Sequence, residues 1–164
     1  MTEASSWITP DNFDKYAFMF FGWGGASLAM TLSNLGTAYG TAKAGMGIAS
    51  MSVTRPDLAF KAIIPIIMAG ILSIYGLIVA ILITQNVKPD VSDHSLYFLQ
   101  LNAGIVCGLS NGIAGYTIGL TGESGVKFYG INENIFVGLI LILIFAEVLG
   151  LYGMIAGIIM SLAS

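Results

Sequence analysis

Four long stretches of this chain carry almost no charge, and they constrain its fold more than any other feature. They run over residues 16–42, 62–87, 94–122 and 134–164, the last interrupted only by Glu147. Each exceeds the ~20 residues that a helix needs to cross about 30 Å of hydrocarbon. We therefore predict an all-α membrane protein with four transmembrane helices, at residues 16–42, 58–84, 96–121 and 134–162.

The amino-acid composition is also typical of an integral membrane protein. Charged residues make up 9% of the sequence and the mean hydropathy is +0.87, whereas an ordinary soluble domain is roughly 25% charged. The net charge of −3, with scattered basic residues, excludes a nucleic-acid footprint. The acidic N-terminal segment contains Pro10 and lacks the basic start of a signal peptide. We expect the first span to remain in the mature protein.

Basic residues predict the orientation. The two hairpin loops hold four of them, and the termini together with the central loop hold two, Lys15 and Lys88. Because basic loops stay in the cytosol, the hairpin loops are expected there and the termini in the lumen or exterior. The predicted organisation is a polar N-terminal segment (1–15), a first hairpin (16–84), a lumenal loop (85–95) and a second hairpin (96–164).

An internal duplication relates the two hairpins. Residues 68–76 align with residues 145–153 through shared Ala, Tyr and Gly, and Gly36 and Gly40 find counterparts in Gly115 and Gly119 at nearly the same offset. In this register Gly70 takes the place of Glu147. Chance similarity between low-complexity apolar helices is the alternative.

Small residues recur every four positions in the first and third spans, whereas the second and fourth are rich in Ile and Leu. Small side chains let helix backbones approach closely. A bundle with two narrow and two bulky faces is wedge-shaped, and wedges packed side by side close into a ring. The predicted helix-packing residues are Gly36, Gly40, Gly104, Gly108, Gly112, Gly115 and Gly119.

Glu147 is the candidate functional residue. A carboxylate at the centre of a bilayer costs about 2.5–3.5 kcal/mol on insertion scales, so chemistry is a better explanation for it than packing. Desolvation disfavours the anion there, and we expect a neutral acid that releases its proton only where water or a cation is supplied. The alternative is a protonated Glu that joins neighbouring helices by a hydrogen bond.

Other chemistries find little support. The segment 40–47 lacks the GxxxxGK[ST] pattern of a phosphate-binding loop. His94 has no second His or Cys nearby for a metal site. Cys107 is interpreted as a small apolar packing residue. We predict no catalytic residue, no metal and no cofactor.

Several motifs carry a resemblance to a known family. The segments IPIIMAGILSIYGLIV, GTAYGTAKAGMGIA and, above all, FVGLILILIFAEVLGLYGMI resemble the c-type 16-kDa proteolipid of eukaryotic vacuolar-type proton-pumping ATPases (V-ATPases), over residues 22–159. The resemblance implies a membrane ring of such subunits, with spans 1 and 3 inside and spans 2 and 4 outside. It implies that Glu147 is the essential proton-binding carboxylate and that the compartment is a vacuole, lysosome or other endomembrane organelle.

The resemblance also implies partners. They are other proteolipid subunits, the a-type stator subunit with its buried arginine, a central-stalk subunit, a soluble ATP-hydrolysing sector and membrane lipid. Glu147 would stay protonated while facing lipid and release its proton near that arginine, while this chain performs no chemical step itself. Tyr75 is a candidate hydroxyl partner of the carboxyl, and Tyr152 competes for that role.

Two further questions stay open at this stage. A sodium ion would need several oxygen ligands, and residues 67–70 of span 2, expected to face Glu147, offer none from their side chains. The proton is therefore favoured. Two other function classes are a proton-coupled secondary transporter, for which Pro65 is a weak hint of a broken helix, and a structural scaffold or pore-former, in which Glu147 would be dispensable.

Overall fold

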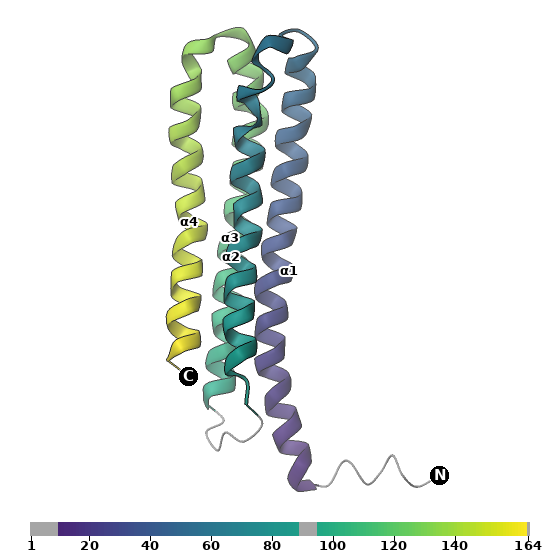
Figure 1. The fold of residues 1–164 in the computed structure, drawn as a ribbon, viewed down its shortest axis with the longest axis vertical. Coiled ribbons are helices and arrows are strands. Elements are labelled where there is room, and N and C mark those ends of the chain that lie inside the picture. Colours follow the sequence, from purple (N-terminus) through teal and green to yellow (C-terminus); the bar gives the residue numbers. More distant parts are fainter. Residues whose placement is uncertain (1–9, 89–94, 164) are drawn as a thin grey trace, which may run out of the picture.

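The structure, a computed structural model, describes residues 10–88 and 95–163, which form four long helices side by side (Figure 1). The helices are α1 (Pro10–Ser52), α2 (Ile64–Asn86), α3 (Ser95–Ile131) and α4 (Phe136–Leu162). Three short 3-10 turns are η1 (Pro56–Leu58), η2 (Lys61–Ile63) and η3 (Glu133–Ile135). The described residues contain no strand, and the predicted all-α fold of two fused hairpins is confirmed.

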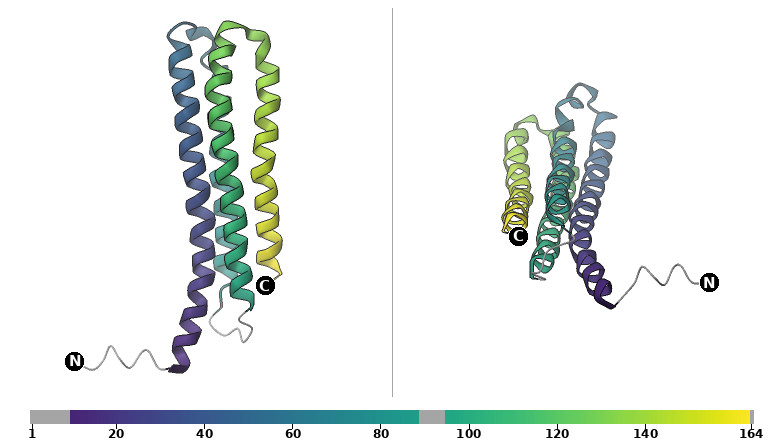
Figure 2. Two further views of the ribbon diagram at one scale, coloured as in Figure 1. Left: turned by 180° about the vertical axis from the view of Figure 1, so that it is seen from behind. Right: turned by 60° about the horizontal axis from the view of Figure 1, so that its bottom comes forward.

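The four helices alternate in direction along the bundle. The segments 53–63 and 132–135 lie together at one end, here called the loop end, and the chain enters and leaves at the other (Figures 1 and 2). α1 and α3 therefore run in one direction, and α2 and α4 in the other. α1 and α4 stand on opposite sides of the bundle, with α2 and α3 between them (Figure 2).

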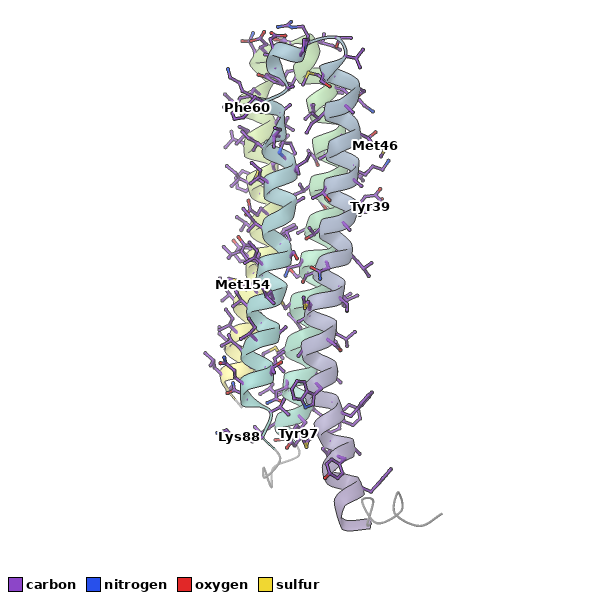
Figure 3. All side chains as sticks on the ribbon, turned by 45° about the vertical axis from the view of Figure 1, so that its right-hand side comes forward. Tyr39, Met46, Phe60, Lys88, Tyr97 and Met154 are labelled. Carbon is purple, nitrogen blue, oxygen red and sulfur yellow. The ribbon has the colours of Figure 1, made fainter. Side chains whose placement is uncertain are left out.

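Three of the four helices have the length and apolar composition of membrane spans, over Lys61–Asn86, Ser95–Ile131 and Glu133–Leu162. α1 falls outside this set because Gly, Ser, Thr and Asn dilute its apolar residues. It is nevertheless the longest helix and stands alongside the others (Figure 1). Apolar side chains cover much of the outer surface of the bundle (Figure 3). The apolar spans and the helical bundle together make the chain a multi-pass membrane protein.

The helices extend beyond the stretches expected from charge. α1 continues past residue 42 to Ser52, and α3 continues past residue 121 to Ile131. The reason is that the length of a charge-free stretch indicates only the part of a helix that lies in the hydrocarbon core of the membrane, whereas the helix itself can continue into water. Glu123 supports the extension, since its carboxylate contacts Lys43 at 3.3 Å and Lys127 at 2.9 Å.

The start of the second span was predicted wrongly. Instead of one helix from residue 58, the chain forms η1 and η2, and α2 begins only at Ile64. Pro65 lacks a backbone N–H and fits only the first turn of a helix. It therefore starts α2 and leaves the rest of that helix unbroken.

The core divides into two apolar clusters, one above the other along the bundle. The cluster nearer the loop end includes Leu72, Ala114 and Ala146, and the other includes Ala29 and Cys107. Between the two levels lie the buried polar side chains of Ser33 and Asn111. The bundle is thus crossed by a polar layer near the middle of its helices, at the level of Glu147.

Candidate functional site

Glu147 lies midway along α4, the helix of residues 136–162, and it is the one charged residue of that helix. Its side chain is partly buried, whereas Ala146 and Gly150 beside it are buried. The stripe of α4 that faces the core consists mainly of small residues and Leu. Glu147 borders this stripe, so its carboxyl lies at the edge of the bundle beside α2.

The hydroxyl of Tyr75 on α2 donates a hydrogen bond to Oε1 of Glu147, with an O···O distance of 3.3 Å. This is longer than the 2.5–3.0 Å usual for an O–H···O bond, so the interaction is weak. It is the one hydrogen bond that the described residues give to this carboxyl. Tyr152 points elsewhere and is 62% exposed, because five residues turn an α-helix by about 140° beyond a full turn.

Small residues of α4 allow the close packing that fixes this site. A Cβ added at Gly150 would lie 2.5 Å from Leu72 Cδ2, and one at Gly157 would lie 3.1 Å from Cys107 Cβ. Ser110 on α3 also donates a hydrogen bond of 2.6 Å to the carbonyl of Leu149. The helix that carries Glu147 is therefore held directly against α2 and α3.

The predicted packing glycines lie where α1 meets α3. A Cβ at Gly36 would lie 2.6 Å from Gly112 Cα, and one at Gly119 would lie 2.8 Å from Gly40 Cα. Gly104 and Gly115 press in the same way on the backbone of α1, at Gly25 and Gly36. Gly108 faces the carbonyl of Leu28. The two backbones touch along much of their length, and a side chain at these positions would separate them.

A pair of polar contacts near the level of Glu147 was not anticipated from the sequence. Ser73 on α2 donates a hydrogen bond to Oδ1 of Asn34 on α1. Asn111 on α3 donates through Nδ2 to Oγ of Ser33, at 3.1 Å. The signal that could have revealed them is the tripeptide Leu-Ser-Asn, which occurs at both 32–34 and 109–111.

Charged side chains gather at the loop end. Arg55 lies 2.6 Å from Glu133 and 3.3 Å from Asp57, which links the loop of the first hairpin to that of the second. The hydrogen bonds from Arg55 hold the pKa of Asp57 below its usual range. The same contacts, led by Asp57, raise the pKa of Arg55. These groups are exposed and lie far from Glu147 along the bundle.

The site offers little for a metal or cofactor. Within residues 10–88 and 95–163, no group of three His, Cys, Asp or Glu side chains lies close enough to hold a metal ion. His94 lies outside the described residues. The segment 40–47 continues α1 as a helix, so its glycines serve packing: a Cβ at Gly47 would lie 2.8 Å from Glu123 Cα.

The model of the family described as the C subunit of ATP synthase matches the chain twice, over residues 24–83 and 101–160. The chain is 56% identical to the human 16 kDa proteolipid, type c, of the V-type proton ATPase, over 87% of this chain and 91% of the human one. It is 49% identical to the c'-type V-type proton ATPase proteolipid of Saccharomyces cerevisiae, over 87% of each chain. It is 50% identical to the 16 kDa V-type proton ATPase proteolipid of Chrysotila carterae, over 87% of this chain and 90% of the relative.

The two family matches confirm the internal duplication and fix its register. The two matched segments begin and end 77 residues apart, which is also the offset between residues 68–76 and 145–153. Gly70 is then the counterpart of Glu147, as predicted. Gly36 and Gly40 differ from Gly115 and Gly119 by 79, so these pairs are contact partners across two parallel helices and not equivalents in the repeat.

Proposed function

The chain belongs to the family of ATP synthase C subunits, and on this premise we propose that it is the proton-carrying rotor subunit of a vacuolar-type proton-pumping ATPase. Glu147 binds and releases the proton as a ring of these subunits turns in the membrane. The observation that carries the proposal is a single carboxyl at the midpoint of an apolar helix, at the edge of the bundle. Such a position is reached from the membrane and can meet a neighbouring subunit.

The proposed cycle follows from the energetics of a carboxyl in hydrocarbon. While Glu147 faces lipid it stays protonated, because the neutral acid avoids the desolvation cost of the anion. It releases the proton where a fixed cation and water are supplied, which we assign to a buried arginine of the a-type stator subunit. A soluble sector that hydrolyses ATP drives the rotation through a central stalk, and this chain takes no part in that hydrolysis.

A ring is supported by the relation between the two hairpins. The first hairpin presents Tyr75 to Glu147 of the second. At the offset of 77, Tyr152 is the counterpart of Tyr75 and Gly70 is the counterpart of Glu147. If the next subunit packs on the second hairpin as the second hairpin packs on the first, Tyr152 lies beside Gly70 of that next subunit. In the single chain Tyr152 is 62% exposed and a Cβ at Gly70 would meet nothing within 4 Å. Both positions are therefore free to meet.

The polar groups around the Glu147 carboxyl suit a bound proton better than a bound sodium ion. Tyr75 supplies the one hydrogen bond that the described residues give to the carboxyl. Asn34 and Ser73 are engaged with each other. A sodium ion needs a shell of several oxygens, whereas a proton needs only the carboxyl and a neighbour that accepts or donates a hydrogen bond.

The two alternative classes lose ground on specific features. A secondary transporter is expected to have broken helices at the membrane midplane, but Pro65 lies in the first turn of α2 and the helix continues to Asn86. A scaffold has no use for an ionisable group at the midpoint of α4. Its defining expectation is that Glu147 can be replaced without loss of function.

The proposed orientation places the loop end in the cytosol and the termini in the lumen of an endomembrane compartment, such as a vacuole or lysosome. Its support is the basic residues at the loop end, which are Lys43, Arg55, Lys61 and Lys127.

ATP-driven acidification of membrane vesicles tests the proposal. Vesicles from cells with wild-type protein are compared with vesicles carrying Glu147→Gln, and assembly of the ring is measured in both. Glu133→Gln, which changes an exposed carboxyl at the loop end, is the matched control. We expect Glu147→Gln to abolish acidification with the ring intact and Glu133→Gln to retain it. Acidification by Glu147→Gln rings would exclude Glu147 as the carrier and favour a scaffold.

A further inference from the structure

The two hairpins have the same packing in the polar layer. At the offset of 77, Ser33 corresponds to Ser110 and Gly76 to Gly153. Ser33 packs against Gly76 within the first hairpin, and Ser110 packs against Gly153 within the second. A difference between the hairpins at this level can therefore be compared residue by residue.

Such a difference lies one residue further along, at the two asparagines. In the first hairpin, Oδ1 of Asn34 accepts a hydrogen bond from Ser73. In the second hairpin, the counterpart of Asn34 is Asn111 and the counterpart of Ser73 is Gly150. Gly150 has no hydroxyl to offer. The amide oxygen is thus occupied in the hairpin without a carboxylate and open in the hairpin with Glu147.

The orientation of the Asn111 amide follows from its neighbours. The hydroxyl of Ser33 donates to the carbonyl of Ala29 at 2.7 Å, so the Asn111 atom that faces Ser33 must be the donor, Nδ2. The carbonyl oxygen Oδ1 then faces α4, where a Cβ on Gly150 would lie 2.7 Å from it. Asn111 is fully buried, and Oδ1 has no hydrogen-bond partner among the described residues. A buried acceptor without a partner destabilises the fold, because its lost hydration is not replaced by a hydrogen bond.

The protonated carboxyl of Glu147 lacks the complementary group. A neutral carboxylic acid has one O–H donor, and the Tyr75 contact uses the tyrosine hydroxyl as donor, leaving the acid's own hydrogen without an acceptor. Glu147 precedes Gly150 by three residues, and positions i and i+3 of a helix are about 5–6 Å apart at Cβ. The Glu147 side chain is long enough to direct its carboxyl toward Oδ1 of Asn111, and one water molecule can bridge two polar groups that lie too far apart for a direct hydrogen bond.

We propose that Asn111 is a positioning residue for the proton on Glu147: its Oδ1 accepts, through one buried water, the hydrogen bond of the protonated carboxyl. Gly150 keeps that oxygen open by supplying no competing hydroxyl. The first hairpin lacks this device because Ser73 occupies Asn34. The inference rests on the proposed function, since it concerns the same proton.

The other groups around Glu147 are few. α2 contributes the hydroxyl of Tyr75. On α3, the buried thiol of Cys107 lies 3.9 Å from the Tyr75 carbonyl and accepts a contact of 3.4 Å from Nδ2 of Asn111. α1 contributes the neutral Ser33 and Asn34 to the layer. No charged side chain of the described residues forms an ion pair with the carboxyl. Within this chain, Asn111 and Tyr75 are therefore the groups expected to change its proton affinity.

The test measures the pH dependence of Glu147 modification in native membranes that hold the assembled pump. A hydrophobic carbodiimide adds to protonated carboxyls, and mass spectrometry of the extracted chain gives the fraction modified at each pH. Asn111→Leu removes the acceptor and keeps the branched shape and the number of heavy atoms of the side chain. Asn34→Leu makes the same change in the hairpin without a carboxylate and is the control.

In Asn111→Leu the protonated form loses its acceptor, so the pH of half-modification is expected to fall by about half to one unit. The control should keep the wild-type midpoint. A structural role for Asn111 would lower assembly without moving the midpoint of the rings that remain. An unchanged midpoint in Asn111→Leu, or an equal shift in Asn34→Leu, overturns the inference.

Gly150→Ser and Gly150→Ala form a second test, which decides the matter where Asn111→Leu rings do not assemble. Both add the same Cβ next to Oδ1 of Asn111 and Leu72. The serine adds a hydroxyl that can occupy Oδ1, as Ser73 does in the first hairpin. We expect the serine variant to have the lower midpoint, and equal midpoints would refute the inference.

The outcome also separates this inference from the proposed function. If Glu147 does not carry the proton, Glu147→Gln rings still acidify vesicles. If only the role of Asn111 is wrong, Glu147→Gln is inactive and the midpoints of the asparagine variants coincide.

Discussion

Replacing Tyr75 with Phe removes one hydroxyl from the site and tests its geometry most directly. The tyrosine donates to Oε1 of Glu147, and such a bond is stronger when the carboxyl is ionised. Tyr75→Phe therefore destabilises the anion more than the acid. We expect Glu147 to stay protonated to higher pH, so that release of its proton becomes harder. This shift has the opposite sign to that of Asn111→Leu.

The size of the shift follows from the bond length. A hydrogen bond to a charged group contributes about 1.5–3 kcal/mol at good geometry. The observed O···O distance of 3.3 Å lies beyond the usual range, so about 1 kcal/mol is a suitable value for the difference between the two protonation states. At 1.36 kcal/mol per pH unit this is about 0.7 unit.

The assay is carbodiimide modification of Glu147 as a function of pH, in membranes with assembled rings. Tyr152→Phe is the matched control, because it removes the same atom from the same type of residue on α4 itself. We expect the Tyr75→Phe midpoint to rise and the control midpoint to stay. A midpoint that falls, or that rises equally in both variants, would show that the Tyr75 hydroxyl does not act on the ionised carboxyl.

Three further predictions concern packing, charge and assembly. Gly115→Ala should lower the free energy of unfolding of the purified protein by about 1–3 kcal/mol, because the added methyl group would press on the backbone of α1. Gly138→Ala is the control, since its methyl group would meet nothing within 4 Å and should leave the free energy of unfolding unchanged. Because its pKa is lowered in the folded state, Asp57 stabilises the fold above about pH 4, and this contribution is lost as the pH falls further. In Asp57→Asn, the melting temperature should therefore fall less steeply with decreasing pH than in the wild type. Cysteines placed at Gly70 and Tyr152 should be joined between chains by a short bismaleimide, and a link formed only within a chain would contradict the proposed ring contact.

Much of the fold was predictable because the membrane imposes simple rules. A span needs an uninterrupted apolar length, and a duplicated hairpin leaves the same residues at a fixed offset. Those rules located the four helices and the correspondence between Gly70 and Glu147. They did not locate the ends of α1 and α3, since a helix that leaves the membrane can continue on ion pairs such as Lys43 with Glu123.

The contacts of the site were less accessible to sequence reasoning. Tyr75 and Tyr152 are equivalent in the repeat and equal in chemistry. Which of them approaches Glu147 depends on the rotation of α2 against α4, which only the packed structure provides. Asn34 and Asn111 were overlooked because an amide within an apolar span is commonly a local packing contact. Their equivalence at the offset of 77 was the signal that would have singled them out.

The comparison of the hairpins also explains why a carboxylate at one position does not by itself define a proton site. Gly70 has the space for a larger side chain, yet the neighbouring amide of Asn34 is already satisfied by Ser73. An acid at residue 70 would have to share the amide oxygen of Asn34 with Ser73, so less of its desolvation cost would be compensated. In the second hairpin Gly150 leaves the acceptor open and Glu147 supplies the donor. The two differences, one helical turn apart, are therefore parts of one arrangement, and the proton site comprises α3 as well as α2 and α4.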